Sequence, residues 1–168
     1  MGKEKSYISY FNSPIGIIEI LADENAILHI LFLDDVSESI LDNADKHENV
    51  ITRLAKQQLH DYFFKDKQTF SLPLHFFGTT FQHKVWQQLQ QIPFGKTISY
   101  QQLAIHLGDE KCIRAAASAN GKNPFAIVVP CHRVIGKNGT LTGYAGGLWR
   151  KQWLLEHEHS FAKQPLLF

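Results

Sequence analysis

The sequence predicts two small domains, a mixed α/β domain at the N-terminus and a mostly α-helical domain with a winged-helix-like module at the C-terminus. Three observations carry this prediction. Residues 6–33 have the pattern of short strands joined by turns, residues beyond about 80 show helical periodicity interrupted by glycines, and the charge changes sign near the same point. At 168 residues, the chain suits one domain or two small ones.

The first half predicts three strands followed by a helix. The turn-forming residues 12–14 and 23–25 separate strands at 7–11, 15–21 and 26–33. The acidic stretch 34–49 predicts a surface loop with a weak helix. Residues 50–67 predict an amphipathic helix, because their apolar side chains recur at helical spacing. Residues 72–74 and 76–80 are expected to form the linker between the halves.

The second half predicts short helices with glycine turns. Phe81, Val85, Leu89 and Ile92 form one apolar stripe, which ends before Pro93 and Gly95. Ser99 and Gln102 fit a capping box that opens a helix running to about Leu107. Asp109 can cap a further helix over residues 110–120, with Gly121 ending it. Two such helices joined through Gly108 predict a helix-turn-helix.

The second of these helices is rich in small residues, which allow close approach to another surface. That surface is either a neighbouring helix or a groove of nucleic acid, into which Arg114 would project. After it, Asn138-Gly139 is a strong type I′ turn signal, so residues 134–142 predict a hairpin with Lys137 on a basic wing.

The composition indicates an ordered protein whose two halves differ in net charge. Hydrophobic residues make up 44% of the chain, and no apolar run approaches the roughly 20 residues that span a bilayer. Residues 1–80 hold 7 Lys and Arg against 12 Asp and Glu, whereas residues 81–168 hold 10 against 4. A basic half favours a polyanionic partner, although two solvated faces that happen to differ would give the same balance. We expect Cys112 and Cys131 to be reduced thiols in a cytoplasmic protein.

The segment Pro130-Cys131-His132-Arg133-Val134 follows an apolar run at 125–129. Pro130 biases Val129 toward extended geometry, so this run is expected to be rigid and buried. If extended geometry continued, Cys131 and His132 would point to opposite faces, and a direct thiol–imidazole bond would be unlikely without a turn or a bridging water. On these residues alone, Cys131 is either an inert core residue or a nucleophile.

The second half closely resembles the O6-alkylguanine-DNA alkyltransferase family, the methylated-DNA–protein-cysteine methyltransferases of bacterial type. The resemblance runs from about Gly78 to His159 in ordered blocks, and the first half resembles the family more loosely at residues 12–16. The blocks that carry it are Phe81-Gln82, residues 92–95, 99–104, Asn123-Pro124, Pro130–Val134, residues 142–147 and 153–158. The resemblance implies a ribonuclease-H-like α/β domain over residues 1–77 and a DNA-binding, alkyl-acceptor domain over residues 78–168.

The resemblance also implies the chemistry. The protein would bind duplex DNA through the minor groove, rotate an O6-alkylguanine out of the stack, and transfer its alkyl group to Cys131. His132 would take the thiol proton through a water, Glu158 would hold the imidazole, and Asn123 would hydrogen-bond near the turn that positions the cysteine. Because the product is a thioether, each molecule reacts once.

Further positions carry over from the family one at a time. Arg114 would fill the space left by the extruded base, and Tyr100 would crowd the 3′ phosphate. Tyr144 would donate to guanine N3, with Lys151 nearby. The remaining expected contacts are to the DNA face, from Gln101, Ala115 and Ser118, and to the base edge, from the backbone at Cys131, Val134 and Ala145.

The departures from the family also carry expectations. No cysteine precedes Cys112, so we predict no N-terminal zinc site and no cofactor. We expect a monomer that does not associate with membranes, with double-stranded DNA containing O6-alkylguanine as its partner. Two rival functions are a winged-helix DNA-binding regulator without alkyl transfer and a cysteine hydrolase.

Overall fold

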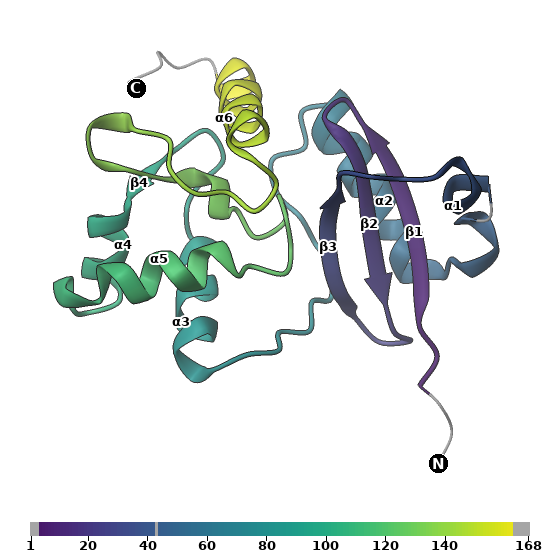
Figure 1. Cartoon of the computed structure of the whole chain (residues 1–168), viewed down its shortest axis with the longest axis horizontal. Helices are drawn as coiled ribbons and strands as arrows, with labels where there is room; N and C mark the ends of the chain where they lie inside the picture. Colours follow the sequence, from purple (N-terminus) through teal and green to yellow (C-terminus); the bar gives the residue numbers. More distant parts are fainter. Residues whose placement is uncertain (1–3, 43, 163–168) are drawn as a thin grey trace. The chain divides into compact units, whose positions relative to one another are not determined.

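The computed structural model describes residues 4–42 and 44–162. The chain divides into two compact units, with the division between Phe76 and Phe77 (Figure 1). Each unit has its own core, and each is described separately below. Among the described residues, no helix is long and apolar enough to cross a membrane.

The first unit contains an antiparallel sheet of order β1-β2-β3. The strands are β1 (Tyr7–Ser13), β2 (Gly16–Ala22) and β3 (Ile27–Leu33), which confirms the three predicted strands. The register pairs Phe11 with Ile18 and Ile20 with Ile30. Two short helical turns, α1 (Glu38–Asp42) and η1 (Ala44–His47), occupy the predicted acidic loop.

Helix α2 (Val50–Phe64) packs against β1 and β2 (Figure 1). It ends three residues before the predicted position. Its N-terminus is fixed by a capping box between Asn49 and Thr52, and the Asn49 amide also donates to the carbonyl of Asp23 in the β2–β3 turn (3.1 Å). The core between helix and sheet is apolar and includes Ile18, Ile20, Ile30, Ala55, Leu59 and Tyr62.

The segment 72–74 was predicted as linker, and this prediction is wrong. Ile27 donates its N–H to the carbonyl of Pro73 (2.7 Å), and His75 donates to the carbonyl of Ile27 (2.9 Å). These bonds form a parallel bridge between Ile27 and Leu74. The segment therefore belongs to the first unit, because its backbone groups pair at the start of β3.

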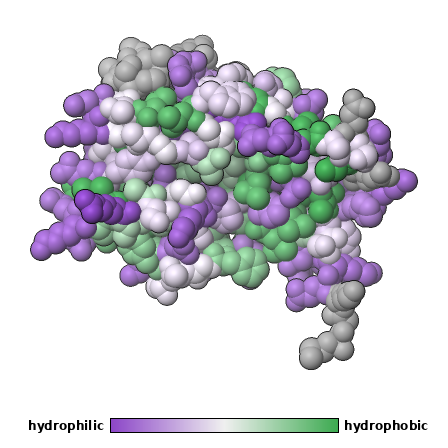
Figure 2. Space-filling view, viewed as in Figure 1, coloured by the Kyte–Doolittle hydropathy of each residue, from purple (hydrophilic) through white to green (hydrophobic). Residues whose placement is uncertain are grey.

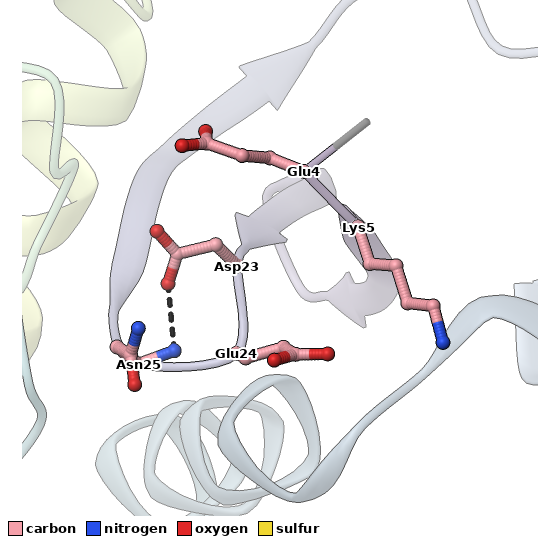
Figure 3. Close-up of a pocket in the computed structure, with 5 residues that line it drawn as sticks. All are labelled: Glu4, Lys5, Asp23, Glu24 and Asn25. Atoms are coloured by element: carbon pink, nitrogen blue, oxygen red, sulfur yellow. Dashed lines mark hydrogen bonds between the residues drawn. The ribbon is translucent and has the colours of Figure 1, made fainter. Parts of the chain in front are cut away.

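A hollow of about 270 Å³ lies beside the β2–β3 turn and is lined by Glu4, Lys5, Asp23, Glu24 and Asn25 (Figure 3). Asp23 closes this turn, since its Oδ1 accepts from the backbone N–H groups of Asn25 (2.7 Å) and Ala26 (2.8 Å). The same two bonds lower the pKa of the Asp23 carboxyl. The hollow is thus explained by turn geometry.

The second unit is mostly helical. It contains α3 (Thr80–Leu89), α4 (Tyr100–His106), η2 (Glu110–Cys112), α5 (Ile113–Gly121) and α6 (Leu148–Ala162). Both α3 and α4 pack against α5 (Figure 1), and the Trp86 indole donates to the carbonyl of Ala119 (2.9 Å). The predicted helices, the Ser99–Gln102 capping box and the Asp109 cap are confirmed.

The predicted hairpin wing is wrong, although its turn is correct. Asn138 and Gly139 both have positive φ (61° and 78°), as a type I′ turn requires. However, β5 (Val134–Ile135) pairs in parallel with β4 (Ile98–Ser99) and not with residues 141–142. The turn is instead closed as η4 (Lys137–Gly139), with Gly136 donating to the carbonyl of Thr140 (2.7 Å).

Candidate active site

A buried turn places Cys131. The backbone of residues 125–131 folds into consecutive tight turns, with Val129 donating to the carbonyl of Phe125 (3.0 Å) and Cys131 to that of Val129 (2.8 Å). Ile127 adopts φ 70°, an unusual conformation for a β-branched residue. The expectation that the run is buried is met at Phe125, Ile127 and Val129.

Asn123 holds both ends of this turn. Its Nδ2 donates to the carbonyls of Phe125 (3.2 Å) and Val129 (2.8 Å), and its Oδ1 accepts from the N–H of Phe125 (2.9 Å). One side chain therefore hydrogen-bonds three backbone groups of the turn. The position of Cys131 depends on this arrangement.

The chain turns again at the cysteine. Cys131–Arg133 forms the 3-10 turn η3, so the alternating geometry that would separate Cys131 and His132 does not continue. Arg133 donates its N–H to the carbonyl of Pro130 (3.0 Å). The backbone then enters β5, which holds the end of the turn against β4.

His132, Arg133 and Glu158 form a buried charged network. Nε2 of His132 lies 2.8 Å from Oε2 of Glu158, and Nε of Arg133 lies 2.6 Å from Oε1. Burial opposes ionisation of Glu158, but its hydrogen bonds to His132 and Arg133 and the charge of Arg133 prevail and hold its pKa at about 2. Burial lowers the pKa of His132 despite the nearby carboxylate. The imidazole is therefore neutral, and its hydrogen lies on Nε2, facing Glu158.

Cys131 is a buried free thiol with 6% of its surface exposed. Burial raises its pKa, and the hydrogen bond of Asn123 and the charge of Lys151 act in the opposite direction without overcoming it. The resting sulfur is thus a thiol that must lose its proton before it can act as a nucleophile.

Lys151 is fully buried and anchors the loop that follows β5. Its Nζ donates to the carbonyls of Val134 (2.7 Å), Thr142 (2.9 Å) and Gly143 (3.4 Å), which uses all three ammonium hydrogens. Burial lowers its pKa to about 8. The hydroxyl of Tyr100 donates to the same Thr142 carbonyl (3.1 Å).

The loop 142–147 carries Tyr144 and Ala145. Arg150 donates from Nη1 to the carbonyl of Gly146 (2.9 Å), and its guanidinium lies 4.7 Å from the centroid of the exposed Trp149 ring. Burial, followed by the charge of Cys131, raises the pKa of Tyr144 well above its usual value of 10.0. Tyr144 is therefore a phenol that can donate a hydrogen bond. Ala145 is exposed, whereas Val134 is buried.

Three buried polar atoms of this site have no hydrogen-bond partner in the described part of the chain: Nδ1 of His132, the hydroxyl oxygen of Tyr144 and Oδ1 of Asn120. Asn120 contacts the backbone of the cysteine, since its Nδ2 donates to the Cys131 carbonyl (3.4 Å). Buried polar groups are rarely left unpaired. Their gathering around one thiol indicates a site built for a polar ligand.

The sequence of the second unit matches the family described as "6-O-methylguanine DNA methyltransferase, DNA binding domain" over residues 80–160. Residues 6–76 match the family described as "6-O-methylguanine DNA methyltransferase, ribonuclease-like domain". The chain belongs to the 6-O-methylguanine DNA methyltransferase family. The resemblance identified from the sequence is confirmed in both halves.

Individual relatives agree with this assignment. The methylated-DNA–protein-cysteine methyltransferase of Methanosarcina acetivorans is 41% identical over 92% of this chain and 99% of its own length. The constitutive methylated-DNA–protein-cysteine methyltransferase of Bacillus subtilis is 44% identical over 84% of this chain and 87% of its own length. The crystal structure of Mycobacterium tuberculosis OGT in complex with DNA has a TM-score of 0.81 at 38% identity, covering 92% of this chain and 94% of that one.

The residues expected from the family fall into two groups in the structure. Cys131, His132, Glu158 and Asn123 meet at the buried site, with Tyr100, Tyr144, Lys151 and Val134 around them. Gln101, Arg114, Ala115 and Ser118 are exposed on α4 and α5. Close packing of the small residues on α5 is confirmed at Ala116 and Ala119, which are buried. Ala115 and Ser118 are exposed, and their approach to a groove of nucleic acid stays a prediction.

Sequence reasoning missed two residues of the site. Arg133 was quoted only as part of a motif, yet it is buried, bonds Glu158 and donates to the carbonyl of Ile92 (2.7 Å). Asn120 gave no local signal, because an asparagine before a glycine reads as a helix end. Within the described ranges, no three His, Cys, Asp or Glu side chains gather as a metal site.

Proposed function

We propose that this protein repairs O6-alkylguanine, mainly O6-methylguanine, in duplex DNA by transferring the alkyl group to Cys131. The observation that carries the proposal is the buried thiol beside a neutral imidazole whose Nε2 is held by ionised Glu158. This arrangement leaves Nδ1 as a proton acceptor on the side away from the carboxylate.

The reaction proceeds as a displacement at the alkyl carbon. The Cys131 proton passes through water to Nδ1 of His132, the sulfur forms a bond to the alkyl carbon, and the bond between that carbon and guanine O6 breaks. The departing guanine carries the electron pair, and the Tyr144 phenol donates to the base to reduce its charge. No cofactor is required, because the lesion itself supplies the alkyl group. The thioether product offers no easy leaving group, so the protein acts once.

The exposed faces of α4 and α5 are the proposed DNA-binding surface. Arg114, Ala115 and Ser118 lie at spacings that share one side of α5, and small side chains permit close approach to the minor groove. Arg114 would occupy the space left by the extruded base, with Tyr100 beside the 3′ phosphate. We place the protein in the cytoplasm as a monomer, which suits two unpaired cysteines and one acceptor per molecule.

The test is an intact-mass measurement after incubation with a duplex oligonucleotide containing one O6-methylguanine. We expect a gain of one CH₂ on Cys131, complete at one equivalent and missing in Cys131→Ser. Binding to DNA without an adduct would support the winged-helix regulator instead. Repeated turnover of an ester or peptide would support a cysteine hydrolase.

A further inference from the structure

A buried arginine contacts the loop that carries Tyr144. Arg150 lies in the first turn of α6 with 4% of its surface exposed. Its Nη1 donates to the carbonyl of Gly146 (2.9 Å), and its guanidinium lies 4.7 Å from the centroid of the Trp149 ring. An arginine is rarely buried so fully. The carbonyl and the ring hold its charge at one place beside the loop.

The indole of Trp149 packs on the same loop. A Cβ atom added at Gly147 would lie 3.3 Å from Cδ1 and Nε1 of Trp149, so the ring rests against the Gly147 backbone. Gly147 has φ 96°, a conformation that a side chain would strain. The ring is 57% exposed while the guanidinium that it contacts is buried. The indole therefore covers one side of the Arg150 charge.

The charge of Arg150 acts on Tyr144. The phenol oxygen is buried and has no hydrogen-bond partner among the described residues. Burial and the charge of Cys131 raise the pKa of Tyr144, whereas the charge of Arg150 acts in the opposite direction. Arg150 therefore favours negative charge on the phenol oxygen. An oxygen gains such charge when it gives its hydrogen to a base.

Departure of the guanine requires this kind of support. As the bond from sulfur to the alkyl carbon forms, the bond from that carbon to O6 breaks, and its electron pair goes to the base. The base becomes a stronger acceptor, and the phenol hydrogen of Tyr144 shifts toward it. Part of the negative charge then lies on the phenol oxygen. A fixed cation acts strongly on such charge, because the phenol oxygen is shielded from water.

We propose that Arg150 is a positioning residue for alkyl transfer: held by the Gly146 carbonyl and the Trp149 indole, its guanidinium stabilises the charge that develops on Tyr144 as the guanine departs. This inference rests on the proposed function and adds to it a residue that acts through Tyr144. It also gives the exposed Trp149 a role, since the indole limits the access of water to the guanidinium.

Arg150 could instead serve only to hold the loop, and the two roles differ in how they depend on the leaving group. A loop support slows every lesion by the same factor. A charge that supports the departing base matters more when that base is a poorer leaving group. O6-methyl-7-deazaguanine provides such a base, because carbon in place of N7 makes the purine more electron-rich and its anion more basic.

The test compares single-turnover rates, with saturating protein, on duplexes containing O6-methylguanine or O6-methyl-7-deazaguanine. We expect Arg150→Met to slow the guanine lesion by about 10-fold and to widen the ratio of the two rates by about 3-fold or more. Arg150→Lys restores the charge without the planar contacts, so it should recover the ratio more fully than the rate. Trp149→Ala should widen the ratio in the same direction by a smaller factor.

Leu148→Ala is the matched control, because Leu148 is exposed in the same turn of α6. It should leave both rates unchanged. A ratio that stays constant in Arg150→Met and Trp149→Ala overturns the proposal, even where both rates fall. If Arg150→Met does not fold, Trp149→Ala at its exposed position decides alone. Absence of any adduct on Cys131 of the wild-type protein contradicts the proposed function itself, which distinguishes the two failures.

Discussion

Glu158 binds the two residues that follow Cys131. Its carboxylate accepts from both His132 and Arg133, and all three side chains are buried. Removing one member of such a network leaves an uncompensated charge in the interior, which costs more than an exposed ion pair contributes. The reactivity of Cys131 and the stability of the second unit therefore depend on the same carboxylate.

This dependence predicts a specific acid sensitivity. The pKa of Glu158 is lowered from 4.5 to about 2, so its stabilising contribution is complete above pH 4.5 and is lost as the pH falls toward 2. The shift corresponds to about 3 kcal/mol. Urea unfolding should show the wild type losing stability relative to Glu158→Gln across this window. The exposed Glu156→Gln is the control, and a constant difference from pH 6 to pH 2 would contradict the assignment.

Arg133 shows why part of the site could not be predicted from the sequence. Its neighbours Cys131 and His132 were identified through the family resemblance, and the structure places them with Glu158 and Asn123. Arginine, however, is normally exposed, and nothing local indicates that this one is buried. Its partners, Glu158 and the carbonyl of Ile92, are 25 and 41 residues away in sequence. Only the tertiary structure brings them together.

We predict that Arg133→Met destabilises the protein by about 3 kcal/mol, because Glu158 then lacks its strongest hydrogen-bond donor while remaining buried. Chemical denaturation at pH 7 measures this loss. Arg133→Met combined with Glu158→Leu should recover part of it, since a well-packed apolar pair can replace a buried ion pair. A double variant less stable than the sum of the two single changes would argue against the network.

At the scale of elements, the capping box at Ser99 sets where α4 begins and hence where Tyr100 lies. Ser99 Oγ accepts from the N–H of Gln102 (3.0 Å), and Gln102 Oε1 accepts from the N–H of Ser99 (2.8 Å). Ser99→Ala should cost about 1 kcal/mol of stability, measured by thermal or urea unfolding. Thr97→Ala, at an exposed position just before β4, should cost less. Equal losses would show that the cap is not formed.

The capping box could be predicted from sequence because its partners are three residues apart. The strand pairing of Val134–Ile135 could not, because the alternative hairpin has a correct local turn at Asn138-Gly139. In the structure, Val134 pairs with Ile98 of β4, which lies 36 residues earlier in the chain. No sequence pattern near either residue indicates this pairing. The tight turns at 125–131 were not predicted either, since apolar content indicates burial of the run but not its backbone geometry.

The exposed face of α5 carries a separate prediction about base extrusion. Arg114 is exposed on α5. Arg114→Ala should therefore slow repair of O6-methylguanine in duplex DNA far more than reaction with free O6-benzylguanine, which needs no extrusion. Rates on the two substrates measure the difference. Equal losses on both would place Arg114 in the chemical step and not in DNA recognition.

At the scale of the whole molecule, the basic balance of residues 81–168 overstates the charge available to DNA. Arg133, Arg150 and Lys151 are among its ten basic residues, yet all three are buried. The exposed cations of the described second unit are Lys84, Lys96, Lys111, Arg114, Lys122 and Lys137. Figure 2 shows hydrophilic side chains projecting where α4 and α5 lie in this view. Surface charge, not total charge, determines how many phosphates are contacted.

This surface predicts how strongly DNA binding depends on salt. Each phosphate contact contributes about −0.9 to the slope of log K against log salt, so the six exposed cations in the described part of the second unit account for a slope of up to about −5. Titrations of an unmodified duplex between about 50 and 200 mM salt measure the slope. Lys122→Ala should make it less steep by about 1 if Lys122 contacts a phosphate. Lys56→Ala, in the first unit, should leave it unchanged. A slope well beyond −5 would mean that buried cations become exposed on binding, which the hydrogen bonds of Arg133 and Lys151 oppose.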